Sequence, residues 1–180
     1  VIILACSVLQ YDVKESGLVH VDHPLIQSGD AYLLSKNKMF LDALHYLKDG
    51  LDIRFAFIGN TTGEGHALGY FPTDIADQLV RGEKIVHGPI DHKRPFLHVK
   101  DAARMIYYGI THLVSGSKFL VAGKHSTKLE DFMETMISVS GKKDVQLSQD
   151  KKFGDPNPIK DIYFDIGVLE AVGYQQVFNI

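Results

Sequence analysis

The 180-residue chain lacks features that would place it in several classes of protein. Its single cysteine, Cys6, excludes an internal disulfide and is compatible with a reducing cytosol. The formal net charge of -3 gives no basic excess of the kind that nucleic-acid-binding domains carry. No stretch approaches the roughly 20 apolar residues of a membrane span. We therefore expect a cytoplasmic globular protein that binds neither nucleic acid nor a membrane.

The known phosphate-binding loops are also missing. A dinucleotide-binding unit needs a Gly-x-Gly-x-x-Gly or Gly-x-x-Gly-x-x-Gly sequence after its first strand. The nearest stretch, Gly63-Glu-Gly65-His-Ala-Leu-Gly69, has a spacing that is off by one. No Gly-Lys-Ser/Thr sequence is present, which excludes a P-loop. We therefore expect any phosphate-cradling half of a dinucleotide site to lie outside this sequence.

The opening residues, 1–6, form a continuous apolar run that is typical of a strand buried on both faces of a parallel sheet. Such a strand needs neighbours on both sides, so we expect the sequence to start within a domain. A first strand whose leader has been removed is the alternative.

Alternating strand and helix patterns predict an α/β protein with a mostly parallel sheet in its first part. Predicted strands lie at 1–6, 52–58, 84–87, 96–99, 118–122 and 145–147, and predicted helices at 30–48, 72–81, 100–113, 128–140 and 167–172. Residues 7–29 and 150–161 are expected to be loops. The elements after residue 65 are shorter, which indicates a smaller α+β lobe.

Tyr32 and Lys36 are candidate catalytic residues. They stand four positions apart in a predicted helix, so they share one helix face. An ammonium near a phenol favours the phenolate, and such a tyrosine can exchange a proton with an alcohol or carbonyl. One Tyr-x-x-x-Lys pair per chain is close to chance, however, and an ordinary solvated pair explains it as well.

Ser7 supports a catalytic role for Tyr32 and Lys36. It directly follows the first strand, at the sheet edge where open parallel sheets bind ligands. Ala5-Cys6-Ser7-Val8-Leu9-Gln10-Tyr11, followed by Tyr32-x-x-x-Lys36, resembles the extended short-chain dehydrogenase/reductase superfamily, in particular its NAD-dependent epimerase/dehydratase branch for nucleotide sugars. Ser7, Tyr32 and Lys36 fall on the positions of that branch's catalytic serine/threonine, tyrosine and lysine. Asp12 replaces the glycine that usually follows the tyrosine at Tyr11.

The resemblance extends along nearly the whole chain in the same order. The matching segments are Ile53-Arg54-Phe55, the glycine-containing loop 59–65, the stretch 82–88, Arg94-Pro-Phe-Leu-His-Val-Lys-Asp101, the strand 118–123 and the terminal segment 164–174. The serine spacing and the 94–101 segment are the most specific of these matches.

The resemblance implies a Rossmann-like domain with a small substrate lobe. Residues 1–65 would be the C-terminal part of the NAD(P)-binding domain, and residues 66–180 mainly the substrate-binding lobe, with some segments returning to the first domain. The cofactor would be NAD or NADP, and the protein a homodimer formed through the helix that carries Tyr32.

The resemblance also implies a role for each site residue. Tyr32 would be the acid/base, and Lys36 would favour its ionisation and hold the nicotinamide ribose. Ser7 would hydrogen-bond the reacting oxygen. Asn60 would contact the substrate, and the Arg94 guanidinium would meet the diphosphate of a nucleotide-activated sugar.

Two departures from the family pattern leave other functions open. Pro95 replaces an aspartate, and Phe57 stands where the branch often has an asparagine that meets the sugar nucleotide. A dehydrogenase or reductase of a non-sugar carbonyl or alcohol, or a truncated non-catalytic fragment, are the alternatives. A metal site is not expected, because His20 and His23 lack partners with ligand spacing.

Overall fold

A computed structural model describes residues 1–150 and 159–178 of the chain. Its centre is a parallel sheet with the strand order β1-β3-β8, formed by β1 (Ile2–Ser7), β3 (Ile53–Ile58) and β8 (Lys118–Val121). The register places Ser7 opposite Ile58, so these two strands end at the same edge of the sheet. The α/β class expected from the sequence is confirmed.

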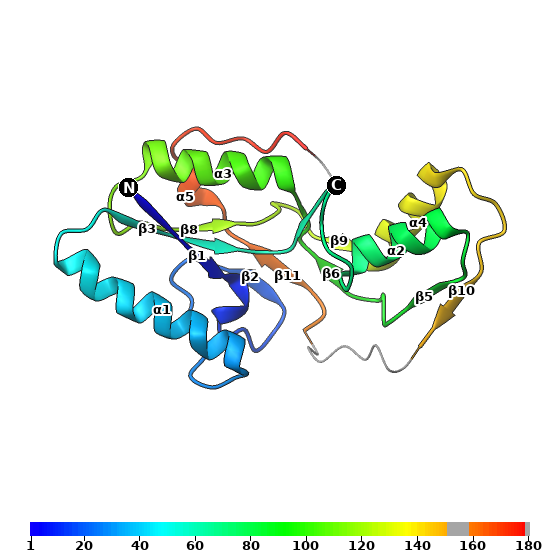
Figure 1. Cartoon of the computed structure of the whole chain (residues 1–180), viewed down its shortest axis with the longest axis horizontal. Coiled ribbons are helices and arrows are strands. Elements are labelled where there is room, and N and C mark those ends of the chain that lie inside the picture. The colour runs from blue at the N-terminus through cyan, green and yellow to red at the C-terminus, as the bar shows by residue number, and fades with distance from the viewer. Residues whose placement is uncertain (151–158, 179–180) are drawn as a thin grey trace.

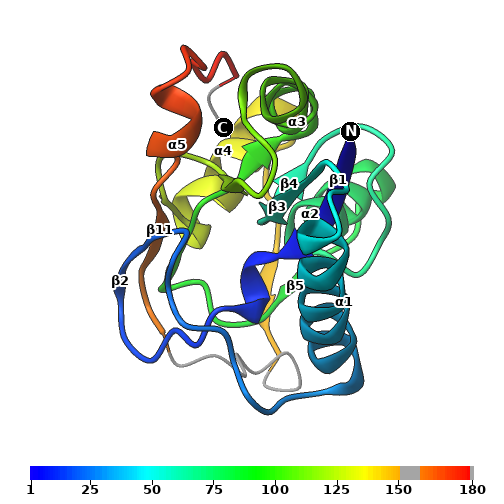
Figure 2. The ribbon, with the colours of Figure 1, turned by 90° about the vertical axis from the view of Figure 1, so that its left-hand side faces the viewer.

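Two helices cover the two faces of this sheet (Figures 1 and 2): α1 (Ala31–Lys48) on one side and α3 (Val99–His112) on the other. The middle strand β3 is therefore buried on both faces. Phe40 of α1 packs edge-on against Phe55, with ring centroids 4.9 Å apart, and lies 5.8 Å from Phe57. Burying an aromatic side chain of this kind contributes about 1.5–3 kcal/mol.

A smaller layer lies beside the sheet, at the right of Figure 1. It contains α2 (Phe71–Arg81), α4 (Leu129–Ser140) and the parallel pair β5 (Ile85–His87) and β10 (Leu147–Gln149). Ile75, Leu79, Ile85 and Met133 form its core. Gly82 and Gly141 end the two helices with left-handed backbone conformations, at φ values of 71° and 68°.

Short strands and turns connect these parts. They are η1 (Val8–Gln10), β2 (Gly17–Val19) paired with β11 (Ile162–Phe164), β4 (Thr61–Thr62) paired with β7 (Leu97–His98), β6 (Lys93–Arg94) paired with β9 (Thr127–Lys128), and α5 (Gly167–Glu170). The sequence predicts β7 within 96–99 and α5 within 167–172. It does not predict the other five strands, because two or three residues carry no periodicity. The predicted loop 7–29 therefore contains η1 and β2. Most of the predicted loop 150–161, residues 151–158, lies outside the described residues.

The first strand differs from expectation. It was expected to be buried on both faces, but Ile2 is 44% exposed and Ala5 is also exposed. Within residues 1–150 and 159–178, β1 pairs with β3 alone. The predicted strand at 145–147 is also displaced, since β10 begins at Leu147. In the part of the chain that the structure describes, no helix combines the length and apolarity needed to cross a membrane.

A buried carboxylate fastens the end of the described chain to α3. Asp101 is fully buried, and its side chain accepts hydrogen bonds from the backbone N–H groups of Val177 (3.1 Å) and Phe178 (2.7 Å). Arg104 donates a third bond at 2.9 Å. His98 accepts from the N–H of Lys100 and caps α3. Both side chains therefore have a structural role in this protein.

We expect Asp101→Asn to lower the free energy of unfolding by about 2–3 kcal/mol. The amide keeps a single acceptor oxygen, so either Arg104 or the N–H groups of Val177 and Phe178 lose their acceptor. Urea unfolding followed by circular dichroism measures the loss. Asp42→Asn, on an exposed ion pair with Lys38, is the matched control and should change stability little. An unchanged urea midpoint for Asp101→Asn would contradict this role.

Candidate active site

Ser7 lies at the carboxyl end of β1 and caps η1. Its Oγ accepts a hydrogen bond from the N–H of Leu9 at 3.2 Å, and its own N–H donates to Gln10 Oε1 at 2.8 Å. The capping bond uses the hydroxyl as an acceptor, so its proton is still available as a donor. The carboxyl edge of a parallel sheet is where such folds bind ligands.

Tyr32 and Lys36 occupy the first turns of α1. Asp30 starts this helix by accepting the N–H of Leu33 at 2.9 Å, as the sequence predicts. Lys36 Nζ lies 5.9 Å from the centroid of the Tyr32 ring and donates to the carbonyl of Ala5 at 2.7 Å. Tyr32 is 51% exposed, so its phenol is accessible to a substrate. The helix therefore places a phenol and an ammonium beside the end of β1.

Every residue that the sequence predicts for the site lines one cavity of about 510 Å³. These residues are Ser7, Tyr32, Lys36, Asn60 and Arg94. They come from β1, α1, the loop after β3, and β6. The structure thus brings the predicted residues together, while their chemical roles stay predictions.

Arg94 already has structural partners. Its Nη1 donates to the carbonyls of Lys93 (2.8 Å), Ile159 (3.2 Å) and Lys160 (3.3 Å). The guanidinium carries five N–H donors, so these bonds and a place in the cavity wall are compatible. Asn60 is exposed, and its backbone carbonyl accepts a hydrogen bond from the N–H of Leu97 at 2.9 Å.

Sequence reasoning missed several lining residues. His66, Tyr70, Phe71 and His92 belong to the same cavity wall. His66 and Tyr70 form an edge-on ring pair with centroids 4.4 Å apart. The only local signal was the glycine-containing loop, which says nothing about which side chains face β1.

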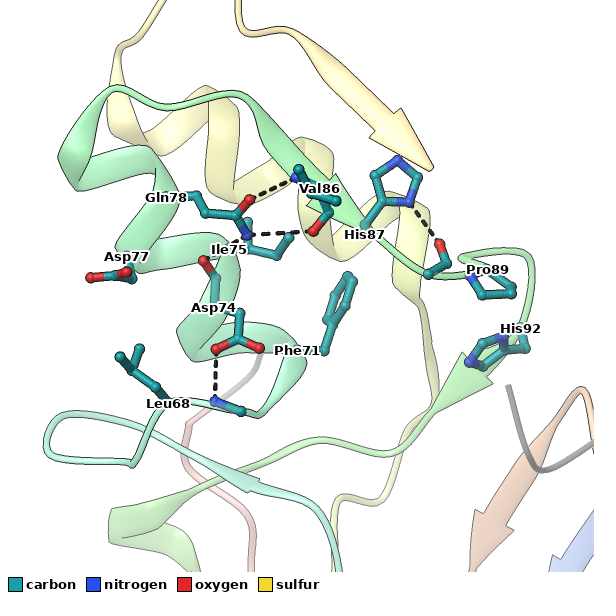
Figure 3. Close-up of a pocket in the computed structure, with 12 residues that line it drawn as sticks. Leu68, Phe71, Asp74, Ile75, Asp77, Gln78, Val86, His87, Pro89 and His92 are labelled. Atoms are coloured by element: carbon teal, nitrogen blue, oxygen red, sulfur yellow. Dashed lines mark hydrogen bonds between the residues drawn. The ribbon is translucent and has the colours of Figure 1, made fainter. Parts of the chain in front are cut away.

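A second cavity of about 430 Å³ adjoins the first, since Phe71 and His92 line both. Figure 3 shows it between α2 and the segment 86–92. Its polar groups are partly fixed within the protein: Asp74 accepts the N–H of Gly69 at 2.7 Å, and Gln78 Oε1 accepts that of Val86 at 2.6 Å. The two cavities therefore share part of their walls.

The sequence from residue 3 to residue 122 matches the model of the family described as "NAD dependent epimerase/dehydratase family". The chain belongs to this family. No curated protein matches the sequence significantly.

Solved structures share the fold at low sequence identity, each matched over 98% of this chain. They include an epimerase candidate from Burkholderia cenocepacia (24% identity, TM-score 0.88), RMD from Pseudomonas aeruginosa complexed with NADPH (20%, 0.88) and UDP-glucuronic acid 4-epimerase from Bacillus cereus in complex with NAD (17%, 0.84). The chain spans 58%, 61% and 56% of these proteins, respectively.

One departure of this epimerase/dehydratase family member from the family pattern is visible in the structure. Phe57, at the position where the family often has an asparagine, is 1% exposed and packs against Tyr11 with centroids 4.9 Å apart. Neither residue lines the 510 Å³ cavity. The position therefore contributes to the core and offers no polar contact to a substrate.

The histidines considered for a metal have other partners. His20 Nδ1 lies 2.9 Å from Asp165 Oδ2, and His23 Nε2 lies 3.3 Å from the carbonyl of Asp12. Within residues 1–150 and 159–178, no group of three or more His, Cys, Asp or Glu side chains is arranged to hold a metal ion.

Cys6 lines the cavity of this family member beside Ser7 but is only 3% exposed. Burial raises the pKa of its thiol to about 12, and the nearby Lys36 ammonium offsets only part of this effect. The thiol is therefore neutral at physiological pH, and it is no candidate nucleophile.

We expect the sole thiol, Cys6, to resist alkylation at pH 8 in the folded protein. A pKa raised from 9.0 to about 12 lowers the thiolate fraction by about 10³-fold relative to an unshifted thiol. Iodoacetamide labelling, followed by mass spectrometry with and without urea, measures the ratio of rates. Similar rates in the two conditions would show that the thiol is neither buried nor shifted.

Proposed function

We propose that the intact protein is an NAD(P)-dependent epimerase, dehydratase or reductase of a nucleotide-activated sugar. The observation that carries this proposal is the gathering of Ser7, Tyr32, Lys36, Asn60 and Arg94 around one cavity in a chain that belongs to this family. Together, these side chains supply a proton-transfer group, an activating cation and hydrogen-bond donors for a polar substrate.

Tyr32 would act as the acid/base. As an exposed phenolate it can accept the proton of a sugar hydroxyl, and as the phenol it can donate a proton to a carbonyl oxygen. Ser7 would donate a hydrogen bond to the same oxygen, which fixes the reacting carbon relative to the phenol. Lys36 would stabilise the phenolate by its charge.

The residues present fit a nicotinamide cofactor. Lys36 Nζ has three N–H donors and uses one for the carbonyl of Ala5, which leaves donors for ribose hydroxyls at the carboxyl edge of the sheet. When bound, the nicotinamide would accept or return a hydride at the carbon next to the reacting oxygen. The sequence contains no glycine fingerprint, so we expect the pyrophosphate to be held outside this chain.

The two adjoining cavities support an extended substrate. The first would hold the reacting sugar against Tyr32, and Arg94 in its wall would meet the diphosphate, because a guanidinium fork matches phosphate oxygens. The second, with the Phe71 ring at its side, would receive the nucleoside. We further propose a cytoplasmic homodimer formed through α1, which exposes Leu34 and Leu41.

A second candidate function is oxidation or reduction of a non-sugar carbonyl or alcohol. The buried position of Phe57 favours it, because the family's usual amide for the sugar nucleotide is replaced by a core aromatic side chain. The same Tyr32, Lys36 and Ser7 would serve that reaction.

Tyr32→Phe should lower kcat of the intact protein by about 10²–10⁴-fold, because it removes the proton-transferring hydroxyl while the ring remains. Steady-state absorbance of NADH or NADPH measures turnover wherever the reaction has net redox change, and product chromatography does so otherwise. Tyr107→Phe is the matched control, since Tyr107 is exposed on α3 and lies outside the cavity. Near-normal turnover of Tyr32→Phe would refute the acid/base role.

Nucleotide sugars should raise the melting temperature of the cofactor-loaded intact protein, since a ligand that binds only the folded state stabilises it. UDP-, GDP- and dTDP-sugars, each compared with its free sugar, form the test panel in a thermal-shift measurement. We expect a shift with at least one nucleotide sugar and none with free sugars. If no member of the panel shifts the protein, the sugar-nucleotide assignment fails and the non-sugar candidate takes its place.

A further inference from the structure

Two buried side-chain amides join the segment after β1 to helix α1. Gln10 Nε2 donates to Asn37 Oδ1 at 2.9 Å, and Asn37 Nδ2 donates to the carbonyl of Ile26 at 2.7 Å. The N–H of Ile26 donates to the carbonyl of Gln10 at 2.8 Å. These bonds close a ring between η1, α1 and the loop before α1. Gln10 is fully buried and Asn37 is 9% exposed, so losing one partner would leave the other amide buried and unsatisfied.

The direction of the ring is fixed by backbone groups at its ends. Gln10 Oε1 faces the N–H of Ser7, which can only donate, so the Gln10 amide nitrogen must face Asn37. The carbonyl of Ile26 can only accept, so Asn37 must present its nitrogen there. Neither amide can flip without losing a bond, and each side chain therefore holds one orientation.

The ring connects the two parts of the candidate site. Gln10 holds the backbone of Ser7, and Asn37 directly follows Lys36 on α1. Neither Gln10 nor Asn37 lines the cavity, so neither touches a substrate there. We propose that Gln10 and Asn37 are positioning residues that fix the Ser7 hydroxyl relative to Tyr32 and Lys36. This inference rests on the function proposed above for these three residues.

The decisive variant replaces both amides by apolar side chains of similar size, Gln10→Met with Asn37→Leu. Replacing both amides removes their mutual bond, but it also takes the acceptor from the N–H of Ser7 and the donor from the carbonyl of Ile26, so we expect a lower stability. A merely structural pair therefore predicts reduced stability with normal turnover of the folded protein. A positioning pair predicts a fall in kcat of about 10- to 100-fold, because displacement by an ångström misaligns the reacting groups. KM should change less than about threefold, since the cavity wall is intact.

Gln27→Met is the matched control. Gln27 lies in the loop before α1, is exposed, and donates to the carbonyl of Leu25 at 3.1 Å. It should leave kcat and KM unchanged. A double variant that folds and retains kcat within about twofold of the wild type overturns the inference.

If the double variant does not fold, Asn37→Asp decides the question. This change keeps the shape of the side chain but places a carboxylate oxygen against the carbonyl of Ile26. A kcat lowered by about tenfold or more at nearly constant KM supports the positioning role. Unchanged kcat overturns it.

If the proposed function is wrong, the wild-type protein turns over no member of the substrate panel, and this outcome is distinct from the results above. In that case a crystal structure of the double variant, or of Asn37→Asp, tests the inference without activity. A shift of Ser7 Oγ relative to the Tyr32 phenol by more than about 0.5 Å supports it, since this is the tolerance of a preorganised site. An unchanged position overturns it.

Discussion

The parallel pairing of β1 with β3 is the constraint on which the rest of the structure depends. It brings Ser7 and Ile58, the last residues of the two strands, to the same edge of the sheet. The other residues of the candidate site line the cavity at this edge. Helix α1 packs across the same two strands, and Lys36 donates back to the carbonyl of Ala5 in β1. One strand pair therefore sets the distance between the serine and the helix that carries the phenol.

The smaller layer completes the cavity from the other side. The loop after β3 and helix α2 supply Tyr70 and Phe71, while the segment before α3 supplies His92 and Arg94. Short ladders such as β4 with β7 and β6 with β9 hold these segments in place. They are too short to be stable alone, and the cores around α2, α4 and the central sheet stabilise them. Packing behind the cavity wall therefore holds these segments in place.

Buried polar groups have two distinct uses in this protein. The Asp101 carboxylate secures residues 177 and 178 against α3, far in sequence from its own position. The Gln10–Asn37 pair instead connects the two elements that carry the site residues. Both follow the same rule, that a buried polar group stabilises one arrangement because every other arrangement leaves it unsatisfied. Cys6, buried without such a role, contributes as a small apolar side chain.

The sequence by itself determined the α/β class, the helix limits at Asp30, Gly82 and Gly141, and the family to which the chain belongs. It also supplied the five residues that the structure gathers around one cavity. These features are encoded within a few neighbouring residues, by periodicity, caps and motif spacing. Only the tertiary structure decided that His66 and His92 share the cavity and that Gln10 meets Asn37 across 27 residues. Such pairings depend on how separate elements pack, which no local pattern records.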